Sequence, residues 1–352
     1  MIIYSYKGEK MAKISKCKNC GAELVFSPSK KCLVCRSCGS EFPVLTESGQ
    51  IKRRVYSFDY DQNDNRVDET QYECPACGSK IISGKERPLG ICASCGNTNL
   101  IKKSESVLIP DGIVPFEISK DKAGEIFQNF VKSRKFAPSD LAQMARSQKL
   151  IGVYNPTWRF GFETHIRYSY VGVKKYLDKE DHEYVRYYPE EKCKEERFEN
   201  VLLSGNRKID DKVLSEIGDY DFSKAIPYSS DYVLGFYVTD TNRDLHIVYD
   251  KYKDEMSYQN QKEVESRVRK NFDSLENFVC KTRFKDEAFN YVGVPIWANH
   301  YTYKGKDYHC YINGQTGKYT GSAPKSVWKI LGTIGAGILG VGLLVLLLIK
   351  LL

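Results

Sequence analysis

Eight cysteines stand in four pairs, and two residues separate the members of each pair. The pairs are Cys17/Cys20, Cys35/Cys38, Cys74/Cys77 and Cys92/Cys95. A two-residue spacer lets two thiolates bind one ion, and two such pairs supply the four sulfur ligands of a tetrahedral zinc site. Glycine follows the second cysteine of every pair and allows a tight turn there. The spacing predicts two structural Zn²⁺ ions, with no open position for a catalytic water.

The metal-ligand pattern occurs twice in the first third of the chain. In each half 14 residues separate the two pairs, and each cysteine of the second half follows its counterpart by 57 positions, as in 74 − 17. This repetition predicts a duplicated zinc ribbon. We expect the first ribbon over residues 1–45, a polar linker over 46–73, and the second ribbon over 74–105.

Two alternatives accompany this interpretation. Paired cysteines also occur as disulfides in small secreted domains, but no apolar run typical of a signal peptide precedes these cysteines. Cys32 is also separated from Cys35 by two residues and could compete as a ligand. Gly39 and the match to the second half favour Cys35 and Cys38. We assign no chemistry to the isolated Cys193, Cys280 and Cys310, because lone cysteines are usually small buried apolar side chains.

Length and composition indicate a larger domain beyond the ribbons. The chain has 352 residues, 41% of them hydrophobic, and its 25 tyrosines favour half-buried strands. We expect an α+β fold class: two small ribbons, a β-rich body with a few helices over residues 106–324, and a C-terminal helix. Two pairs of related motifs, Gly152-Val153 before Pro156-Thr157-Trp158 and Gly293-Val294 before Pro295-Ile296-Trp297, suggest two related sheet units in this body.

The local patterns predict the elements of the body. Ser119 is a candidate N-cap for a helix through Val131, and Ser139 for a second helix to about Gln148. Alternation from Ile151 onward predicts strands, and the charged residues 178–197 predict a surface loop or hairpin. We further expect a helix over 208–217, strands within 236–249, a helix over 255–272, and a final hairpin around Asn313-Gly314.

The C-terminal residues 330–349 contain no charge and match the thickness of a bilayer core as a helix. They predict a transmembrane anchor over residues 325–352, with the bulk of the chain on the cytoplasmic side. Gly332, Ala336 and Gly340 recur every four residues and could support self-association of this helix. The Gly335-x-Gly337-x-x-Gly340 pattern lacks a preceding strand and is not a dinucleotide site.

The formal net charge of +8 falls to 8 − 4 = +4 when two zinc ions are each held by four thiolates. Basic residues concentrate in and after the first ribbon, where they could meet nucleic acid or form a solvated surface. They are Lys7, Lys10, Lys13, Lys16, Lys18, Lys30, Lys31, Arg36, Lys52, Arg53 and Arg54.

The sequence offers no pattern that predicts an enzyme. It contains no Gly-x-x-x-x-Gly-Lys-Ser/Thr loop, no Gly-x-Ser-x-Gly elbow and no His-Glu-x-x-His helix. Its five histidines are scattered, although His300 and His309 fall in the final hairpin region and could approach each other. We therefore expect a non-enzymatic protein.

The chain resembles bacterial membrane proteins with transcription-factor-IIB-type zinc ribbons. The resemblance rests on CKNCGAELVF, CRSCGSEF, CPACGSKI and CASCGN in the ribbons, and on IVPFEISKDKA, KFAPSDL, GVYNPTWRF and VPIWANHYTYKGKDYHCYINGQTGKYTG in the body. The resemblance implies a membrane anchor for a flotillin-like protein of the SPFH class, found beside phage-shock-type envelope stress proteins. It implies no catalytic residues.

These observations lead to one expected function and one alternative. The expectation is a non-enzymatic, tail-anchored adaptor that recruits a partner protein, of the flotillin-like class, to the cytoplasmic face of the membrane during envelope stress. The alternative is a membrane-tethered nucleic-acid binder that uses the basic first ribbon. The ribbon offers few aromatic residues for stacking on bases, only Phe26 and Phe42 nearby, and this weakens the alternative.

Overall fold

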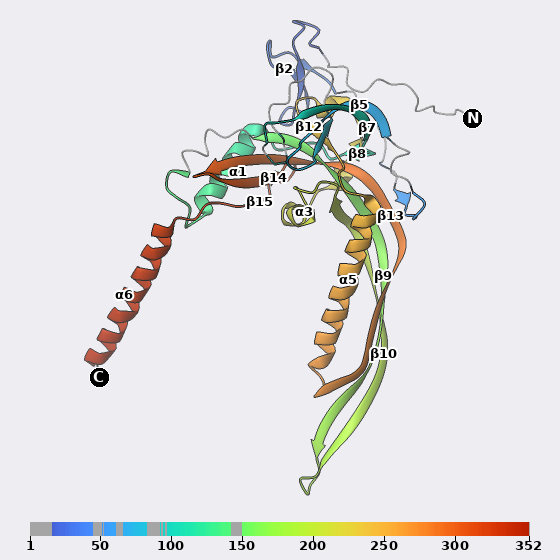
Figure 1. The fold of residues 1–352 in the computed structure, drawn as a ribbon, viewed down its shortest axis with the longest axis vertical. Coiled ribbons are helices and arrows are strands. Elements are labelled where there is room, and N and C mark those ends of the chain that lie inside the picture. Colours follow the sequence, from blue (N-terminus) through green and yellow to red (C-terminus); the bar gives the residue numbers. More distant parts are fainter. Residues whose placement is uncertain are drawn as a thin grey trace.

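The computed structural model describes residues 16–44, 51, 53–60, 66–82, 92, 94–95, 97–141 and 150–351. The body is organised around two very long antiparallel strands, β9 (Ile151–Leu177) and β13 (Ser274–Tyr303), which pair from Ala298↔Ile151 to Ser274↔Val173. Their paired ends leave the body together as a curved arm (Figure 1). This arm and the sheet at its base position the rest of the molecule.

Shorter strands complete one 12-stranded sheet in the described residues, with the central order β11-β8-β13-β9-β12-β6-β5-β7. Their bounds are β4 Arg54–Val55, β5 Arg66–Glu73, β6 Lys80–Ile82, β7 Ile101–Leu108, β8 Gly112–Ile113, β10 Glu183–Ser204, β11 Ile226–Pro227, β12 Tyr237–Asp240, β14 Lys306–Asn313 and β15 Tyr319–Gly321. A separate three-stranded sheet contains β1 Leu24–Ser27, β2 Cys32–Cys35 and β3 Glu41–Phe42. The helices are α1 Lys120–Ser133, α3 Asp211–Ile217, α4 Ser230–Val233, α5 Leu245–Arg269 and α6 Val327–Leu351, with a 3₁₀ turn η3 at Phe222–Lys224.

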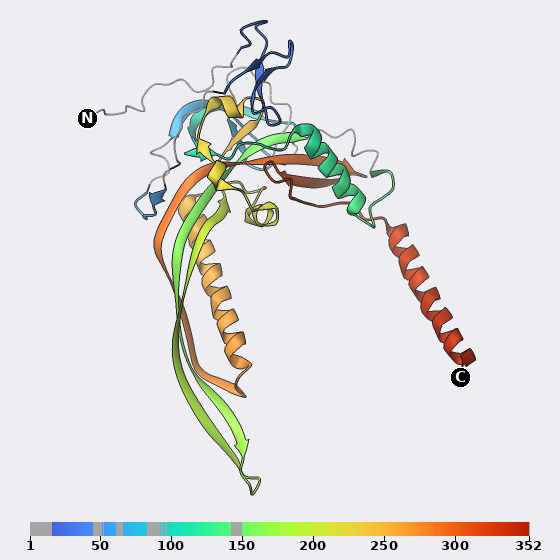
Figure 2. The same ribbon diagram turned by 180° about the vertical axis from the view of Figure 1, so that it is seen from behind.

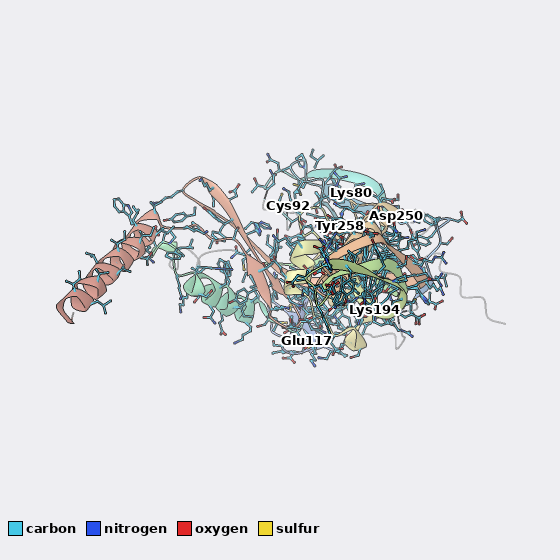
Figure 3. The ribbon with its side chains drawn as sticks, turned by 90° about the horizontal axis from the view of Figure 1, so that it is seen from below. Lys80, Cys92, Glu117, Lys194, Asp250 and Tyr258 are labelled. Carbon is cyan, nitrogen blue, oxygen red and sulfur yellow. The ribbon has the colours of Figure 1, made fainter. Side chains whose placement is uncertain are left out.

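The burial of β9 changes where the strand leaves the body. Residues 152–158 are buried on both faces, whereas from residue 163 buried and more exposed side chains alternate as the pleat requires. In the arm, α5 covers one face, and the Phe160 and Tyr249 rings stack 3.9 Å apart between strand and helix. Figure 3, seen from below the view of Figure 1, shows Lys194 of β10 together with Asp250 and Tyr258 of α5 in this projection.

The arm bends at three bulges. The register shifts between Phe198 and Val201 in β10, and at two places in β13. Asn200, Asn277 and Asp286 adopt positive φ angles of 61°, 51° and 51° at these places. Bulges increase local twist and bend a strand, which accounts for the curvature seen in Figures 1 and 2.

The body contains two similar units, each with a short strand, a helix, a long strand and its hairpin partner. These are β8, α1, β9 and β10 in the first unit, and β12, α5, β13 and β14 in the second. The short strand of each unit pairs in parallel with the long strand of the other, because β8 pairs with β13 and β12 pairs with β9. An approximate two-fold axis therefore passes between β9 and β13.

The repeated Pro-x-Trp motifs lie at this axis, so the predicted relationship between two sheet units is confirmed. Pro156 pairs with Gly293, and Pro295 pairs with Tyr154. The hairpin partners end in equivalent contacts, since Gly205 N donates to Pro156 O and Gly314 N donates to Pro295 O, both at 2.8 Å.

Several local predictions agree with the structure. Ser119 caps α1 by accepting a hydrogen bond from Lys122 N, and residues 178–197 lie in the β9–β10 hairpin. The helix predicted over 208–217 is α3, and the final hairpin around Asn313-Gly314 is formed by β14 and β15. The predicted helix over Ser139–Gln148 falls mostly on 142–149, outside the described residues.

One local prediction was wrong, and one stretch expected as a linker contributes strands. Residues 245–249 were expected in strands but form the start of α5, because the Asp244 carboxylate caps the helix by accepting from His246 N and Ile247 N. The polar stretch 46–73 contains β4, which pairs with β13, and β5, which pairs with β6 and β7. It is therefore partly built into the sheet, and Tyr56 packs edge-on against Tyr249 at 4.7 Å.

The predicted membrane anchor is also contradicted. Among the described residues, no helix is long and apolar enough to cross a membrane. This finding overturns the transmembrane part of the fold class, the anchor over 325–352 and the single-pass membrane localisation. The base of α6 is held to the body, since Lys329 Nζ donates to Ala137 O at 2.7 Å.

Candidate metal centres

The first ribbon brings together Cys17, Cys20, Cys35 and Cys38. Cys17 N bonds Ala22 O at 2.7 Å and Gly21 N bonds Cys17 O at 2.8 Å, which folds the first knuckle. The second knuckle repeats this geometry, with Cys35 N bonding Ser40 O and Gly39 N bonding Cys35 O. Gly21 and Gly39 both have φ of 74°, a left-handed conformation that explains the glycine after each pair.

The sulfur geometry of this cluster fits a metal ion. The four Sγ atoms all lie within 4.8 Å of one another, with Cys17 and Cys38 3.6 Å apart and Cys20 and Cys35 3.4 Å apart. These separations exceed the ~2.05 Å of a disulfide and approach the edge of about 3.8 Å of a tetrahedron with metal–sulfur bonds of about 2.3 Å. The cysteines are free thiols, so the disulfide alternative does not describe this ribbon.

Local contacts separate Cys38, which belongs to the cluster of the first ribbon, from Cys32, which does not. The Ser40 hydroxyl lies 3.1 Å from Cys38 Sγ and lowers the pKa of Cys38 to about 6, which favours the thiolate that metals bind. Cys32 lies in β2 outside the cluster, with its Sγ 3.9 Å from Glu41 Oε2. The structure therefore groups Cys35 and Cys38, rather than Cys32, with the first pair.

The second ribbon brings together Cys74, Cys77, Cys92 and Cys95. Its Sγ atoms also lie within 4.8 Å of one another, with Cys74 and Cys95 3.6 Å apart and Cys77 and Cys92 3.8 Å apart. Cys74 N bonds Ser79 O and Gly78 N bonds Cys74 O, as in the first ribbon. Both sets of four cysteines could thus hold a metal ion, with every ligand supplied by the chain.

The second ribbon is part of the body. Its strand β6 pairs with β12 and β5, and Ile81 of β6 is fully buried. The buried hydroxyls of Ser79 and Ser94 lie 2.8 Å apart, and Asn206 Nδ2 donates to Ser94 Oγ at 2.8 Å. Figure 3 shows Lys80 and Cys92 of this ribbon close to the sheet.

Further contacts fix the second ribbon against the second unit of the body. Asn242 Nδ2 donates to Gly78 O at 2.9 Å, and Tyr311 OH donates to Ser94 O at 3.2 Å. Sequence reasoning did not identify these anchoring residues. The one available signal was that Ser204-Gly205-Asn206 parallels Asn313-Gly314-Gln315 at the end of the equivalent hairpin.

The first ribbon stands apart from the sheet of the body (Figure 1, β2). It contacts the body through β1: Phe26 N donates to Leu234 O at 2.9 Å, and the Phe26 ring lies 4.8 Å from Tyr232. Phe236 extends this contact, because it packs against the ribbon core and also stacks on Phe116 at 4.1 Å. We call residues 232–242 the bridging segment, since β12 within it pairs with the second ribbon.

The knuckles of the first ribbon face solvent. Cys20 and Cys38 are exposed, unlike any cysteine of the second cluster. The basic residues Lys16, Lys18, Lys31 and Arg36 are exposed around them, whereas Lys30 forms an ion pair with Glu41. Phe26 is buried at 4% exposure and is not available to stack on bases. Lys7, Lys10, Lys13 and Lys52 lie outside the described residues.

The remaining sequence candidates form no third metal cluster in the described residues. His300 and His309 pair directly across β13 and β14, as the hairpin suggested, and both rings lie near Tyr311. Burial is the main cause that lowers the pKa of His309. His165 and His182 lie on the arm beside Glu195 and Asp178, and His246 contacts Tyr56 OH at 3.0 Å.

Comparison with known proteins supplies one full-length similarity. The uncharacterized protein YdjG of Bacillus subtilis (strain 168) is 24% identical over 331 residues, which cover 90% of this chain and 91% of that protein. No protein-family model matches the chain, and no solved structure matches it. The similarity therefore covers most of both chains without assigning an activity.

Proposed function

We propose that the chain is a non-enzymatic adaptor whose first ribbon binds a partner protein, with zinc in both cysteine clusters. The observation that carries this proposal is the difference between the two ribbons. The second is anchored in the sheet through β6, Asn206 and Asn242, whereas the first presents its knuckles to solvent. A metal ion gives such a small, exposed ribbon a rigid surface that its few apolar residues could not maintain.

The chemistry of the clusters supports a structural role for the metal. Four thiolates complete a tetrahedral zinc shell, so no coordination position is left to activate water. The spacing of two residues within each pair and the sulfur separations of 3.4–3.8 Å fit a tetrahedral four-sulfur site, and we propose zinc as its metal. The proposed zinc ion therefore stabilises the fold of the ribbon and takes part in no reaction.

The exposed lysines and arginine around the first knuckles favour a partner with an acidic surface. The resemblance stated from the sequence suggests a flotillin-like protein of the SPFH class as that partner. The bridging segment connects the first ribbon to the second and to the core around Phe116, so a bound partner would be held in a fixed orientation to the body.

Crosslinking of the full-length protein in its native cells, followed by mass spectrometry of what co-purifies, tests this proposal. The informative variant is Cys17→Ser/Cys20→Ser, which removes the metal of the first ribbon. Cys32→Ser is its matched control, because Cys32 lies in the same ribbon but outside the cluster. We expect a stoichiometric protein partner with the wild type and Cys32→Ser, and its loss with the double variant.

The same experiment separates the alternative function. Recovery of nucleic acid without a protein partner, with binding that weakens steeply as salt rises, would favour a nucleic-acid binder instead. Exposed Lys16, Lys18, Lys31 and Arg36 support that alternative, whereas the burial of Phe26 counts against base stacking. Equal recovery of a partner with both variants would reject the role of the first ribbon.

A further inference from the structure

Arg159 and Asn290 face each other across the two central strands, where β9 and β13 pair. Opposite residues in an antiparallel pair lie on the same face of the sheet, so their side chains are neighbours. This face also carries η3, whose Phe222 ring lies 4.3 Å from the Arg159 guanidinium carbon. Asn200 of β10 completes the surroundings by accepting from Arg159 Nε at 2.7 Å.

Arg159 is half-buried without a carboxylate partner. Among the described residues, no acidic oxygen lies within 4.0 Å of its guanidinium nitrogens, and its hydrogen-bond partner Asn200 is neutral. Burial and the nearby charge of Arg53 lower the pKa of Arg159 to about 10, and the charge of Glu199 partly opposes this shift. A desolvated guanidinium with unused donors is a favourable place for an oxyanion.

Arg53 adds a second positive charge beside Arg159. Its guanidinium lies over Gly161, two residues along the same face of β9, where a Cβ atom would come within 2.5 Å of Arg53 Nη1. Arg53 forms an ion pair with Glu199 at 2.5 Å. Glu199 also pairs with Arg197 Nε at 3.2 Å, so one carboxylate lies among three guanidinium groups and positive charge is in excess at this position.

Asn290 provides an independent indication of a ligand. Its side chain is fully buried, and neither its Nδ2 nor its Oδ1 has a hydrogen-bond partner. A buried amide without partners lowers stability, so such a residue calls for an explanation. An acceptor group bound beside Arg159 would give Asn290 Nδ2 the hydrogen-bond partner that it lacks.

The internal repeat shows that this polar pair is not required by the fold. The axis relates Pro156 to Pro295, so the pair Arg159/Asn290 corresponds to Ala298/Ile151, which also face each other. In the second unit this position is apolar, and Ala298 is fully buried with Val294 and Ile296. The polar residues therefore occur at only one of two equivalent places in the sheet.

We propose that Arg159, Arg53 and Asn290 form a binding site for a small oxyanion, either a carboxylate or a phosphate group. The guanidinium of Arg159 would bind the anion through two parallel N–H donors. Asn290 Nδ2, on the neighbouring strand β13, would donate a further hydrogen bond to the anion. Asn200 and Phe222 hold the Arg159 side chain in place. This site lies in the body, away from the metal ribbons, and is independent of the adaptor function.

Isothermal titration and thermal unfolding of the full-length, zinc-loaded protein test the site, with inorganic phosphate and malonate as separate probes at constant ionic strength. We expect saturable binding of one probe and a matching rise in the unfolding midpoint. Arg159→Gln should weaken binding by on the order of tenfold or more, as expected when a charge-assisted pair is lost. Arg167→Gln, an exposed arginine further along β9, should bind as the wild type does.

Two further variants, Arg159→Lys and Asn290→Ser, distinguish a loss of binding from a loss of folding. Arg159→Lys keeps the charge but loses the planar pair of donors, so weaker binding in a folded variant supports the proposed geometry. Asn290→Ser should weaken binding with the zinc content unchanged. Binding by phosphate alone or by malonate alone identifies the class of ligand. Absence of saturable binding by both probes, or equal affinity in Arg159→Gln, overturns the proposal.

Discussion

Asn206 Nδ2 lies 2.8 Å from Ser94 Oγ, and this contact joins the second metal ribbon to the end of β10 in the body. The Asn206 side chain also reaches Ser79 Oγ at 3.4 Å, while its Oδ1 accepts from Lys208 N at 2.9 Å. Both serines and Asn206 are buried. The ribbon and the sheet are therefore one folding unit at this point, and a metal ion held by the second cluster would stabilise the body as well as its own knuckles.

Replacement of Asn206 tests this coupling. Asn206→Ala leaves the buried serine hydroxyls and Lys208 N short of partners, and we expect a loss of about 1–3 kcal/mol of unfolding free energy. Denaturant unfolding followed by circular dichroism measures it. Asn271→Ala, at the exposed end of α5, is the control and should change stability by less than about 0.5 kcal/mol. Similar values for the two variants would show that the ribbon is not coupled to the sheet.

The two metal ions should differ in how readily they are removed. Cys20 and Cys38 of the first cluster are exposed, whereas the second cluster has no exposed cysteine. A chelator should therefore remove the metal of the first cluster faster, by on the order of tenfold. The metal of the second cluster is released only after the body opens locally. A colorimetric chelator assay combined with circular dichroism follows both events.

Cys17→Ser identifies which metal leaves first. It should bind one metal equivalent and lose the fast phase, while Cys32→Ser should keep two equivalents and both phases. Acid should act in the same order, because protonation of the thiolates releases the metal. Loss of both ions in a single phase, accompanied by unfolding, would contradict the independence of the first ribbon.

The cysteine clusters could be predicted from the sequence because metal ligands depend on local spacing. Gly21 and Gly39 show why, since the left-handed turns that they allow are fixed by a few residues. The anchoring of the second ribbon could not be predicted in this way. Asn206 and Ser94 are 112 positions apart in the chain, and nothing near either residue indicates the contact. Likewise, the position of Arg53 over Gly161 depends on long-range strand pairing.

The start of α5 shows a different limit of predicting secondary structure from the sequence. Residues 245–249 form a short apolar run, and such runs do not distinguish a strand from a buried helix. Asp244 decides between them by capping the helix, while Leu245, Val248 and Tyr249 lie on one buried face. In the long strands the alternation was readable, but their length of 27 and 30 residues depends on the pairing of the two units about the axis.

The buried ion pair between Arg66 and Asp240 should control stability in a pH-dependent way. Asp240 is fully buried and accepts from Arg66 Nη1 at 2.9 Å and from Thr241 N at 2.7 Å. Burial raises the pKa of Asp240, and the Arg66 charge partly opposes this rise. Arg66→Met should therefore cost about 3–5 kcal/mol at neutral pH, because it leaves a buried carboxylate without its cation.

The sign of the pH dependence follows from the raised pKa of Asp240. A carboxyl whose folded pKa lies above its unfolded value stabilises the protein fully below the unfolded pKa, and this contribution is lost as pH rises through the folded pKa. Arg66→Met raises the folded pKa further, so the difference in stability from the wild type should be smallest in acid and grow toward neutral pH. Denaturant midpoints across this range measure it. Arg167→Met on the exposed arm is the control, and its effect should be small at every pH.

The turn at the end of β14 depends on a glycine for space rather than for its backbone conformation. A Cβ atom on Gly314 would lie 2.5 Å from the Phe116 ring and 2.8 Å from Pro295 Cβ, and Phe116 is fully buried in the core that leads to the first ribbon. Gly314→Ala should therefore lower stability by about 1–3 kcal/mol through overpacking. Gly124→Ala in α1 meets its nearest neighbour, Leu150, at 3.9 Å and should raise stability by about 0.5–1 kcal/mol. Thermal unfolding of both variants should give shifts of opposite sign, and a neutral Gly314→Ala would mean that Phe116 can move without loss of packing.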